Sequence, residues 1–301
     1  MRRYIVPVPA AIFDTRVRLL TDEIRPEWDE SVKELHRKNY ANLVASLSIE
    51  LGALDFHRKI EDFKAIGPLP FSIVSYHNEF LNQARKAFVQ GLYYPALTAS
   101  CALGERILNH LILDLREYFS DKSTYAKVAQ KSSFANWQQA IHVLVDWDVL
   151  LPEAASALRK LEALRLRSLH FTASTYVRLR DDALEALRLL AKLVETQFSV
   201  FGPQPWFIEG TAGACFIKGN WEQNPFIRKF YLPVCPAVGT HYSYSNDNGR
   251  WLLFDYKHYD GDTISDEEFC QRLNARDASL LAPTTMPLAD HIVCFEWQRR
   301  A

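Results

Sequence analysis

The sequence lacks the cysteine and histidine spacings from which structural metal sites are built. Its five cysteines are scattered over 301 residues, and no Cys-x-x-Cys pair or short Cys/His spacing occurs. Because zinc sites draw their ligands from such spacings, we expect neither a metal site nor another cofactor. Scattered cysteines of this kind indicate reduced thiols, which is typical of a cytoplasmic protein.

Long uninterrupted apolar runs are also missing. A membrane-spanning helix needs about 20 consecutive, mainly apolar residues, and charged residues interrupt every candidate stretch. Near the N-terminus, Pro7, Pro9 and Asp14 break the apolar segment that follows the first two arginines, which argues against a signal peptide. The sequence therefore predicts a soluble, cytoplasmic protein that does not associate with membranes.

Neither sign of charge is in excess. The chain has 35 lysine and arginine residues against 36 aspartate and glutamate residues, a net charge of −1. A globally basic nucleic-acid binder is thereby excluded, so contact with a polyanion requires a local basic patch. The Gly-x4-Gly-Lys-Ser/Thr loop and the Gly-x-Ser-x-Gly elbow are absent as well, which leaves nucleoside-triphosphatase and serine-hydrolase chemistry without residues to carry them.

What the chain has in abundance is leucine-rich helical periodicity. Apolar residues make up 48% of the sequence, enough for a packed core, and most of residues 21–200 keep helical spacing. At Gly202, Pro203 and Pro205 the composition changes, because glycine, asparagine and aromatic residues replace the leucines. We expect an α+β protein whose parts are an N-terminal helical extension (1–70), an all-α bundle (71–202) and a smaller α+β domain (203–301).

The C-terminal part carries the strand signals. Two aromatic, β-favouring runs flank Asn248 and Gly249, which predicts an antiparallel hairpin. Ser265 and Glu268 form a capping box, which predicts a short helix. The aromatic residues of this part could stack on RNA bases, but a β-domain core explains them equally well, and we expect most of them to be buried.

One stretch, "LEALRLRSLHF" at residues 161–171, places polar and reactive side chains inside a leucine-rich run. His170 could move a proton near neutral pH, and Arg165 could stabilise the charge of a phosphorane. Together they could cleave RNA by transesterification through the ribose 2′-hydroxyl without a metal. Between residues 158 and 180 Glu162 is the only acid, whereas the bases are Arg159, Lys160, Arg165, Arg167, Arg178 and Arg180.

A packing role explains the same residues. Helical arginines usually form a solvated face, and a histidine among leucines is more often packed than catalytic. In a continuous helix, Arg165 and His170 would lie roughly 140° apart around the axis. For a shared site, either the helix breaks near Ser168, or a second subunit completes the site, or Arg167 takes the place of Arg165.

The order of helical elements over residues 72–200 resembles the HEPN superfamily of α-helical domains. In that family a Gly-x-Tyr-x-x-Ala motif opens one helix and an acid often follows. An arginine then precedes a histidine by four to six residues near the start of the last helix. These positions are matched, in this order, by Gly91, Tyr93, Ala96, Glu105, Arg165 and His170.

The resemblance implies a metal-independent endoribonuclease, commonly a homodimer whose two motifs face each other. Many members are toxins of toxin–antitoxin systems or antiviral defence effectors, so RNA and an antitoxin or other regulatory protein are the implied partners. In this reading Arg165 and His170 are the catalytic residues. The residues expected to support them or to bind RNA are Arg167, Ser168, Glu105, Arg159, Lys160 and Arg178.

Leu166 departs from the family pattern. The residue after the arginine is usually polar in active members, often Asn or Asp, whereas this chain has leucine there. Arg167 or Ser168 could supply the missing polar group. The alternative is a catalytically inactive HEPN-like module that binds RNA, a nucleotide or a protein partner.

Overall fold

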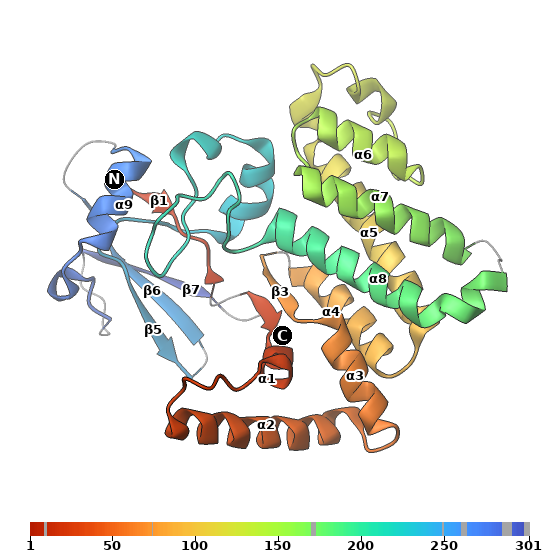
Figure 1. Ribbon diagram of the computed structural model, residues 1–301. Helices are drawn as coiled ribbons and strands as arrows, with labels where there is room; N and C mark the ends of the chain where they lie inside the picture. The colour runs from red at the N-terminus through yellow and green to blue at the C-terminus, as the bar shows by residue number, and fades with distance from the viewer. Residues whose placement is uncertain are drawn as a thin grey trace.

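The computed structural model describes residues 1–8, 11–73, 75–169, 173–248, 250–259, 264–284 and 291–297. The structure is 58% helical and 12% strand, and its strands form small antiparallel sheets. The predicted α+β class is therefore confirmed. Helices form one body, and a three-stranded sheet lies beside it (Figure 1).

Helix α5 (Tyr93–Leu115) is the centre of the helical body. It packs against α4 (Ser75–Val89), α7 (Pro152–Leu169) and α8 (Ala173–Phe198), and the short α6 (Trp137–Asp146) closes one end (Figure 1). Eleven residues of α5 are buried, because its apolar positions occupy more than one stripe of the helix. A helix with several apolar faces belongs inside the bundle.

The turns between these helices follow the sequence signals. Gly91 adopts a positive φ of 82°, and its amide donates to the carbonyl of Phe88, so the chain leaves α4 through a conformation that favours glycine. Residues 170–172 lie outside the described residues. Helix α7 ends at Leu169 and α8 begins at Ala173.

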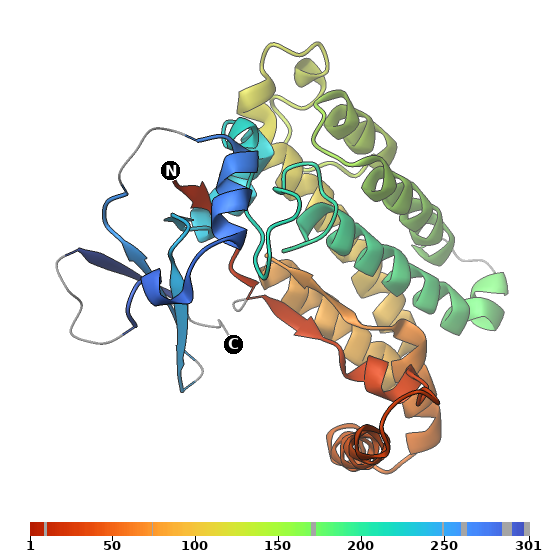
Figure 2. The same ribbon diagram turned by 60° about the vertical axis from the view of Figure 1, so that its left-hand side comes forward.

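The N-terminal helices lie on the flank of this body. Helix α1 (Arg16–Thr21) packs against α3 (Phe56–Ile66). Helix α2 (Glu30–Leu51) runs along the lower edge of the molecule in Figure 1 and is seen almost end-on in Figure 2. Strands β2 (Ile12–Asp14) and β3 (Leu69–Ser72) pair antiparallel beneath α8. Within the described residues no helix has both the length and the apolar composition needed to cross a membrane.

The sheet at the other side has the strand order β5-β6-β7. Strands β5 (Ser243–Asp247) and β6 (Arg250–Tyr256) form the expected hairpin, with Asn248 at a φ of 52°, and β7 (Ile292–Trp297) pairs with β6. Asn at a positive φ is typical of a tight hairpin turn. The hairpin prediction is therefore confirmed.

Two further elements complete this side. Helix α9 (Asp266–Asn274) begins where the Ser265 hydroxyl accepts a hydrogen bond from the Glu268 amide at 3.1 Å, which is the serine half of the predicted capping box. Strand β1 (Arg3–Tyr4) pairs with β4 (Ala237–Val238), so the start of the chain belongs to the C-terminal side of the molecule.

The main hydrophobic core crosses residue 203, where a separate domain was expected to begin. Trp206, Phe226 and Tyr231 are buried and pack around one another, and Phe226 also contacts Phe198 of α8. Two smaller cores lie in the sheet region, one of them around Phe216, Leu253 and Phe269. Part of the segment after residue 203 thus packs with the helices, whereas Ile208 and Phe216 belong to a core of the sheet region. The division at 203 stays a prediction.

Candidate functional site

Arg165 lies near the C-terminal end of α7 and reaches two other helices. Its Nη2 lies 3.0 Å from Oε2 of Glu105 on α5, and its guanidinium carbon lies 5.6 Å from the centre of the Trp137 ring on α6. The Arg165 side chain is 20% exposed. The structure therefore brings together two predicted site residues, Arg165 and Glu105, and adds an aromatic contact.

Trp137 was missed by the sequence analysis. Its side chain is fully buried at the start of α6, and its indole Nε1 donates to the same Glu105 Oε2 at 3.2 Å. A Cβ at Gly104 would lie 2.7 Å from Cη2 of this ring, so glycine permits the close approach of the indole to α5. We call Glu105, Trp137 and Arg165 the Arg165 cluster.

A signal for Trp137 did exist in the sequence. A buried tryptophan needs a partner for its indole N–H, and Glu105 directly follows the glycine against which Trp137 packs. The sequence alone could not pair Glu105 with Trp137, because it does not determine the path of the irregular stretch that connects α5 to α6.

Ser168 points into the contact between α7 and α5. Its hydroxyl donates to the carbonyl of Arg165 at 3.0 Å, and the residue is buried. Burial raises the pKa of the Cys101 thiol to about 11, although a hydrogen bond with Ser168 and the charge of Arg165 act in the opposite direction. A thiol with that pKa stays protonated at neutral pH and is a poor nucleophile.

His170, the second predicted catalytic residue, lies outside the described residues. Helix α7 runs through Ser168 and ends at Leu169, one residue beyond it, so the end of the helix lies close to the position at which a break was considered. The described site is therefore the arginine half of the motif, at the end of α7.

Two of the predicted basic residues are neutralised by acids from other parts of the chain. Arg167 makes a two-pronged contact with Asp182 of α8, at 2.6 and 3.0 Å, and the Asp182 side chain is 4% exposed. Arg180 contacts Asp62 of α3 at 2.7 Å. The basic excess is consequently smaller in space than along the sequence.

The other three predicted RNA-binding cations stay accessible. Arg159 and Lys160 are exposed on α7, and Arg178 is exposed on α8. Within the part of the chain that the structure describes, no carboxylate lies within 4.0 Å of any of these three cations. They are the charges of this region that an anionic partner could meet without displacing an ion pair.

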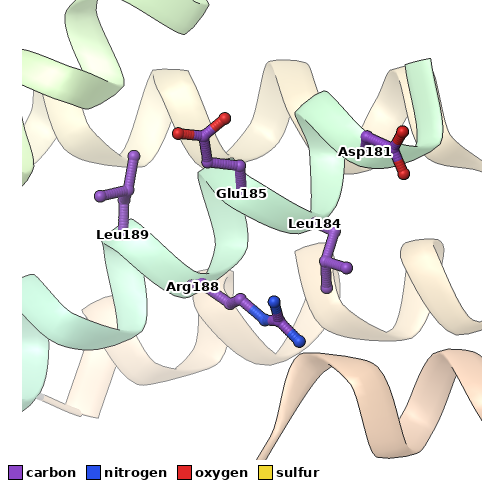
Figure 3. A pocket seen from close by; sticks show the side chains of 5 residues that line it. All are labelled: Asp181, Leu184, Glu185, Arg188 and Leu189. Atoms are coloured by element: carbon purple, nitrogen blue, oxygen red, sulfur yellow. The ribbon is translucent and has the colours of Figure 1, made fainter. Parts of the chain in front are cut away.

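An open depression of about 400 Å³ is lined by five residues of α8 (Figure 3). Figure 3 shows Glu185 and Leu189 pointing away from Leu184 and Arg188, and Arg188 donates to the carbonyl of Ala65 on α3. Because none of its lining residues belongs to the motif, we do not assign the depression to the candidate site. Among the described residues no group of three or more His, Cys, Asp and Glu side chains could hold a metal ion.

Comparison of the chain with protein-family models, with curated proteins and with solved structures finds no match.

Proposed function

We propose that this protein is a metal-independent endoribonuclease of HEPN type. The observation that supports the proposal is the restraint on Arg165, which is held by Glu105 from α5 and by Trp137 from α6. A solvated surface arginine has no such restraint, whereas a guanidinium that must meet a developing phosphorane benefits from a fixed orientation.

In the proposed reaction the His170 imidazole takes the proton from a ribose 2′-hydroxyl, and the 2′-oxygen attacks the adjacent phosphorus. The bond from phosphorus to the 5′-oxygen of the next nucleotide breaks, and that oxygen leaves with the proton that the His170 imidazolium returns. Arg165 stabilises the additional negative charge of the phosphorane. The products are a 2′,3′-cyclic phosphate and a 5′-hydroxyl end.

The proposal includes a homodimer. Ala99 and Ala102 of α5 are exposed beside Glu105, so a second helix could approach the α5 backbone closely at this strip. If two copies pack there, their Arg165 clusters lie near each other. Ala102→Arg would then convert the dimer to a monomer in light scattering and remove activity, whereas an unchanged mass would place the dimer contact elsewhere.

The test is cleavage of single-stranded RNA by the purified protein in excess chelator. We expect cyclic-phosphate ends from the wild-type protein, and a loss of at least about 10²-fold in His170→Ala and in Arg165→Ala. His142→Ala is the matched control, because His142 is exposed on α6 and lacks an arginine at the motif spacing. Intact RNA across varied substrates would contradict the proposal.

A toxin or antiviral defence effector is the cellular role that we propose for this activity. Expression of the wild-type chain should then slow cell growth, and His170→Ala should relieve the effect. Equal toxicity of both proteins would separate the growth defect from RNA cleavage.

Two exposed apolar residues favour a second candidate, an inactive module that binds a protein partner. Leu166 is 46% exposed next to Arg165, and Val177 near the start of α8 is 87% exposed. Apolar side chains at the site favour a protein surface over a polyanion. The second candidate predicts that Leu166→Asp abolishes binding of the protein partner. It also predicts that His170→Ala changes neither the integrity of RNA nor the binding of that partner.

A further inference from the structure

We propose that Trp137 is a positioning residue that, through Glu105, holds the Arg165 guanidinium in the orientation needed to grip a phosphodiester of RNA. The inference rests on the proposed function. Trp137 is fully buried, so it cannot stack on a base, and its effect on any substrate must pass through the other two members of the Arg165 cluster.

Two contacts of different kinds restrict the orientation of the guanidinium. The Glu105 carboxylate lies 3.0 Å from Nη2, and the centre of the Trp137 ring lies 5.6 Å from the guanidinium carbon. An ion pair alone allows the plane of the group to rotate, and contact with a ring alone allows the group to slide. Together they restrict both motions.

Trp137 also fixes the carboxylate that holds the arginine. Its indole N–H donates to Oε2 of Glu105, the same oxygen that contacts Nη2 of Arg165. The indole itself is fixed because it is fully buried and packs against Gly104 of α5, where a Cβ would lie 2.7 Å from its Cη2 atom. Each member of the cluster is therefore placed by another member or by the core.

The remaining donors of Arg165 suit a phosphodiester. Within the described residues Glu105 is the only carboxylate within 4.0 Å of this guanidinium, and its closest approach is to Nη2. A guanidinium carries five N–H donors, so one that meets a single carboxylate keeps N–H groups that can donate two parallel bonds to two oxygens of one phosphate. The Glu105 side chain is 34% exposed, so the cluster lies at the surface, where RNA can reach it.

The experiment compares Trp137→Phe and Glu105→Gln with a matched control, Trp147→Phe. Trp147 is also buried in the α6 region, and its Nε1 donates to Oγ1 of Thr124 at 3.0 Å, so its replacement removes an equivalent hydrogen bond away from Arg165. The first measurement is the NMR signal of the Arg165 Nε–H group, identified as the signal missing in Arg165→Lys. We expect it to move in Trp137→Phe and in Glu105→Gln and to stay in place in Trp147→Phe.

The second measurement is kinetic. In Trp137→Phe we expect kcat to fall about tenfold with KM changed by less than about twofold, because orientation acts on the transition state. In Glu105→Gln we expect kcat to fall while RNA binds about threefold more tightly, because a negative charge near the phosphate is removed. Loss of structure alone would not raise affinity.

The outcomes separate this inference from the proposed function. An Arg165 signal unchanged in both Trp137→Phe and Glu105→Gln overturns the positioning role, whatever the nuclease assays show. Equal losses of kcat in Trp137→Phe and Trp147→Phe overturn it as well. If the wild-type protein cleaves no RNA, the proposed function fails, and the NMR measurement decides the positioning role by itself.

Discussion

Arg180 of α8 donates to Oδ1 of Asp62 on α3 at 2.9 and 2.7 Å, although 118 residues separate them along the chain. Asp62 is fully buried, and its other oxygen accepts from Arg58 and from the Tyr93 hydroxyl, both at 2.8 Å. One carboxylate thus joins α3, α8 and the first residue of α5. Tyr93 is the tyrosine of the Gly-x-Tyr-x-x-Ala pattern, and its hydroxyl donates to a carboxylate that links helices of the core.

Replacing Asp62 should destabilise the fold strongly. Asp62→Ala leaves Arg58 and Arg180 without their shared carboxylate, and we expect the free energy of unfolding in urea to fall by about 2–4 kcal/mol, less than for a fully buried pair because both guanidinium groups are partly exposed. Glu61→Gln on the same helix is the control, because Glu61 only pairs with Lys64 at the surface. Equal unfolding midpoints for the two variants would contradict a structural role for Asp62.

Elements with local signals could be predicted from the sequence, and contacts between distant residues could not. Gly91 ends α4, Ser265 caps α9, and the hairpin turns at Asn248 because each signal lies within a few residues of its effect. The neutralisation of Arg180 by Asp62 has no such local mark. Counting only neighbouring acids therefore overestimated the positive charge around the motif.

The candidate site shows the same division. Arg165 and Glu105 were chosen from a family motif and lie 3.0 Å apart, whereas Trp137 carries no motif and was missed. Its role depends on the crossing of α6 over α5 at Gly104, which the helical period alone does not determine.

Gly104→Ala should be destabilising although alanine is the better helix former. A Cβ at residue 104 would lie 2.7 Å from both the Trp137 ring and Cδ2 of Leu161. Overpacking of this kind costs about 1–3 kcal/mol, which exceeds the gain of about 1 kcal/mol in helix propensity. Thermal unfolding checks the sign, with Ala102→Ser at an exposed position of α5 as the control. A raised Tm in Gly104→Ala would contradict the packing described for Trp137.

Because of His77, the protein should be less stable in mild acid than at neutral pH. Burial, and then the positive charges of His110 and Arg106, lower the pKa of His77 from 6.5 to about 3. Above pH 6.5 the imidazole is neutral in both states, so its contribution to stability is complete. As pH falls from 6.5 towards 3, only the unfolded chain takes up the proton, and stability drops by up to about 1.4 kcal/mol per pH unit.

Urea unfolding between pH 7 and 4.5 measures this dependence. His77→Phe keeps an aromatic ring against Phe198, which His77 contacts edge-on. It should reduce the slope of the unfolding free energy against pH by nearly the contribution of one bound proton. His142→Gln, at an exposed position of α6, should leave the slope as it is in the wild-type protein. A slope retained in His77→Phe would assign the acid sensitivity to other groups.

The three accessible cations should set the salt dependence of RNA binding if RNA is the partner. Changing Arg159, Lys160 or Arg178 to Gln should each reduce the slope of log affinity against log salt by about 0.7, the value for one phosphate contact on a single strand. Fluorescence titrations at several salt concentrations measure the slope. Arg188→Gln is the control, because Arg188 already donates to the Ala65 carbonyl on α3. Identical slopes for all variants would exclude these residues from the RNA contact.

Arg167 should matter more for the α7–α8 contact than for RNA. Its guanidinium contacts the buried Asp182 carboxylate at two points, so Arg167→Met leaves that carboxylate without this partner. We expect the free energy of unfolding to fall by about 1–3 kcal/mol. The loss stays small because the Arg167 side chain is partly exposed. The double variant Arg167→Met/Asp182→Leu replaces both charges with apolar groups and should recover most of that loss. A double-mutant cycle in urea measures the coupling between the two residues. Additive losses would mean that the ion pair does not hold α7 against α8, and the role of Arg167 would then have to be sought at the RNA.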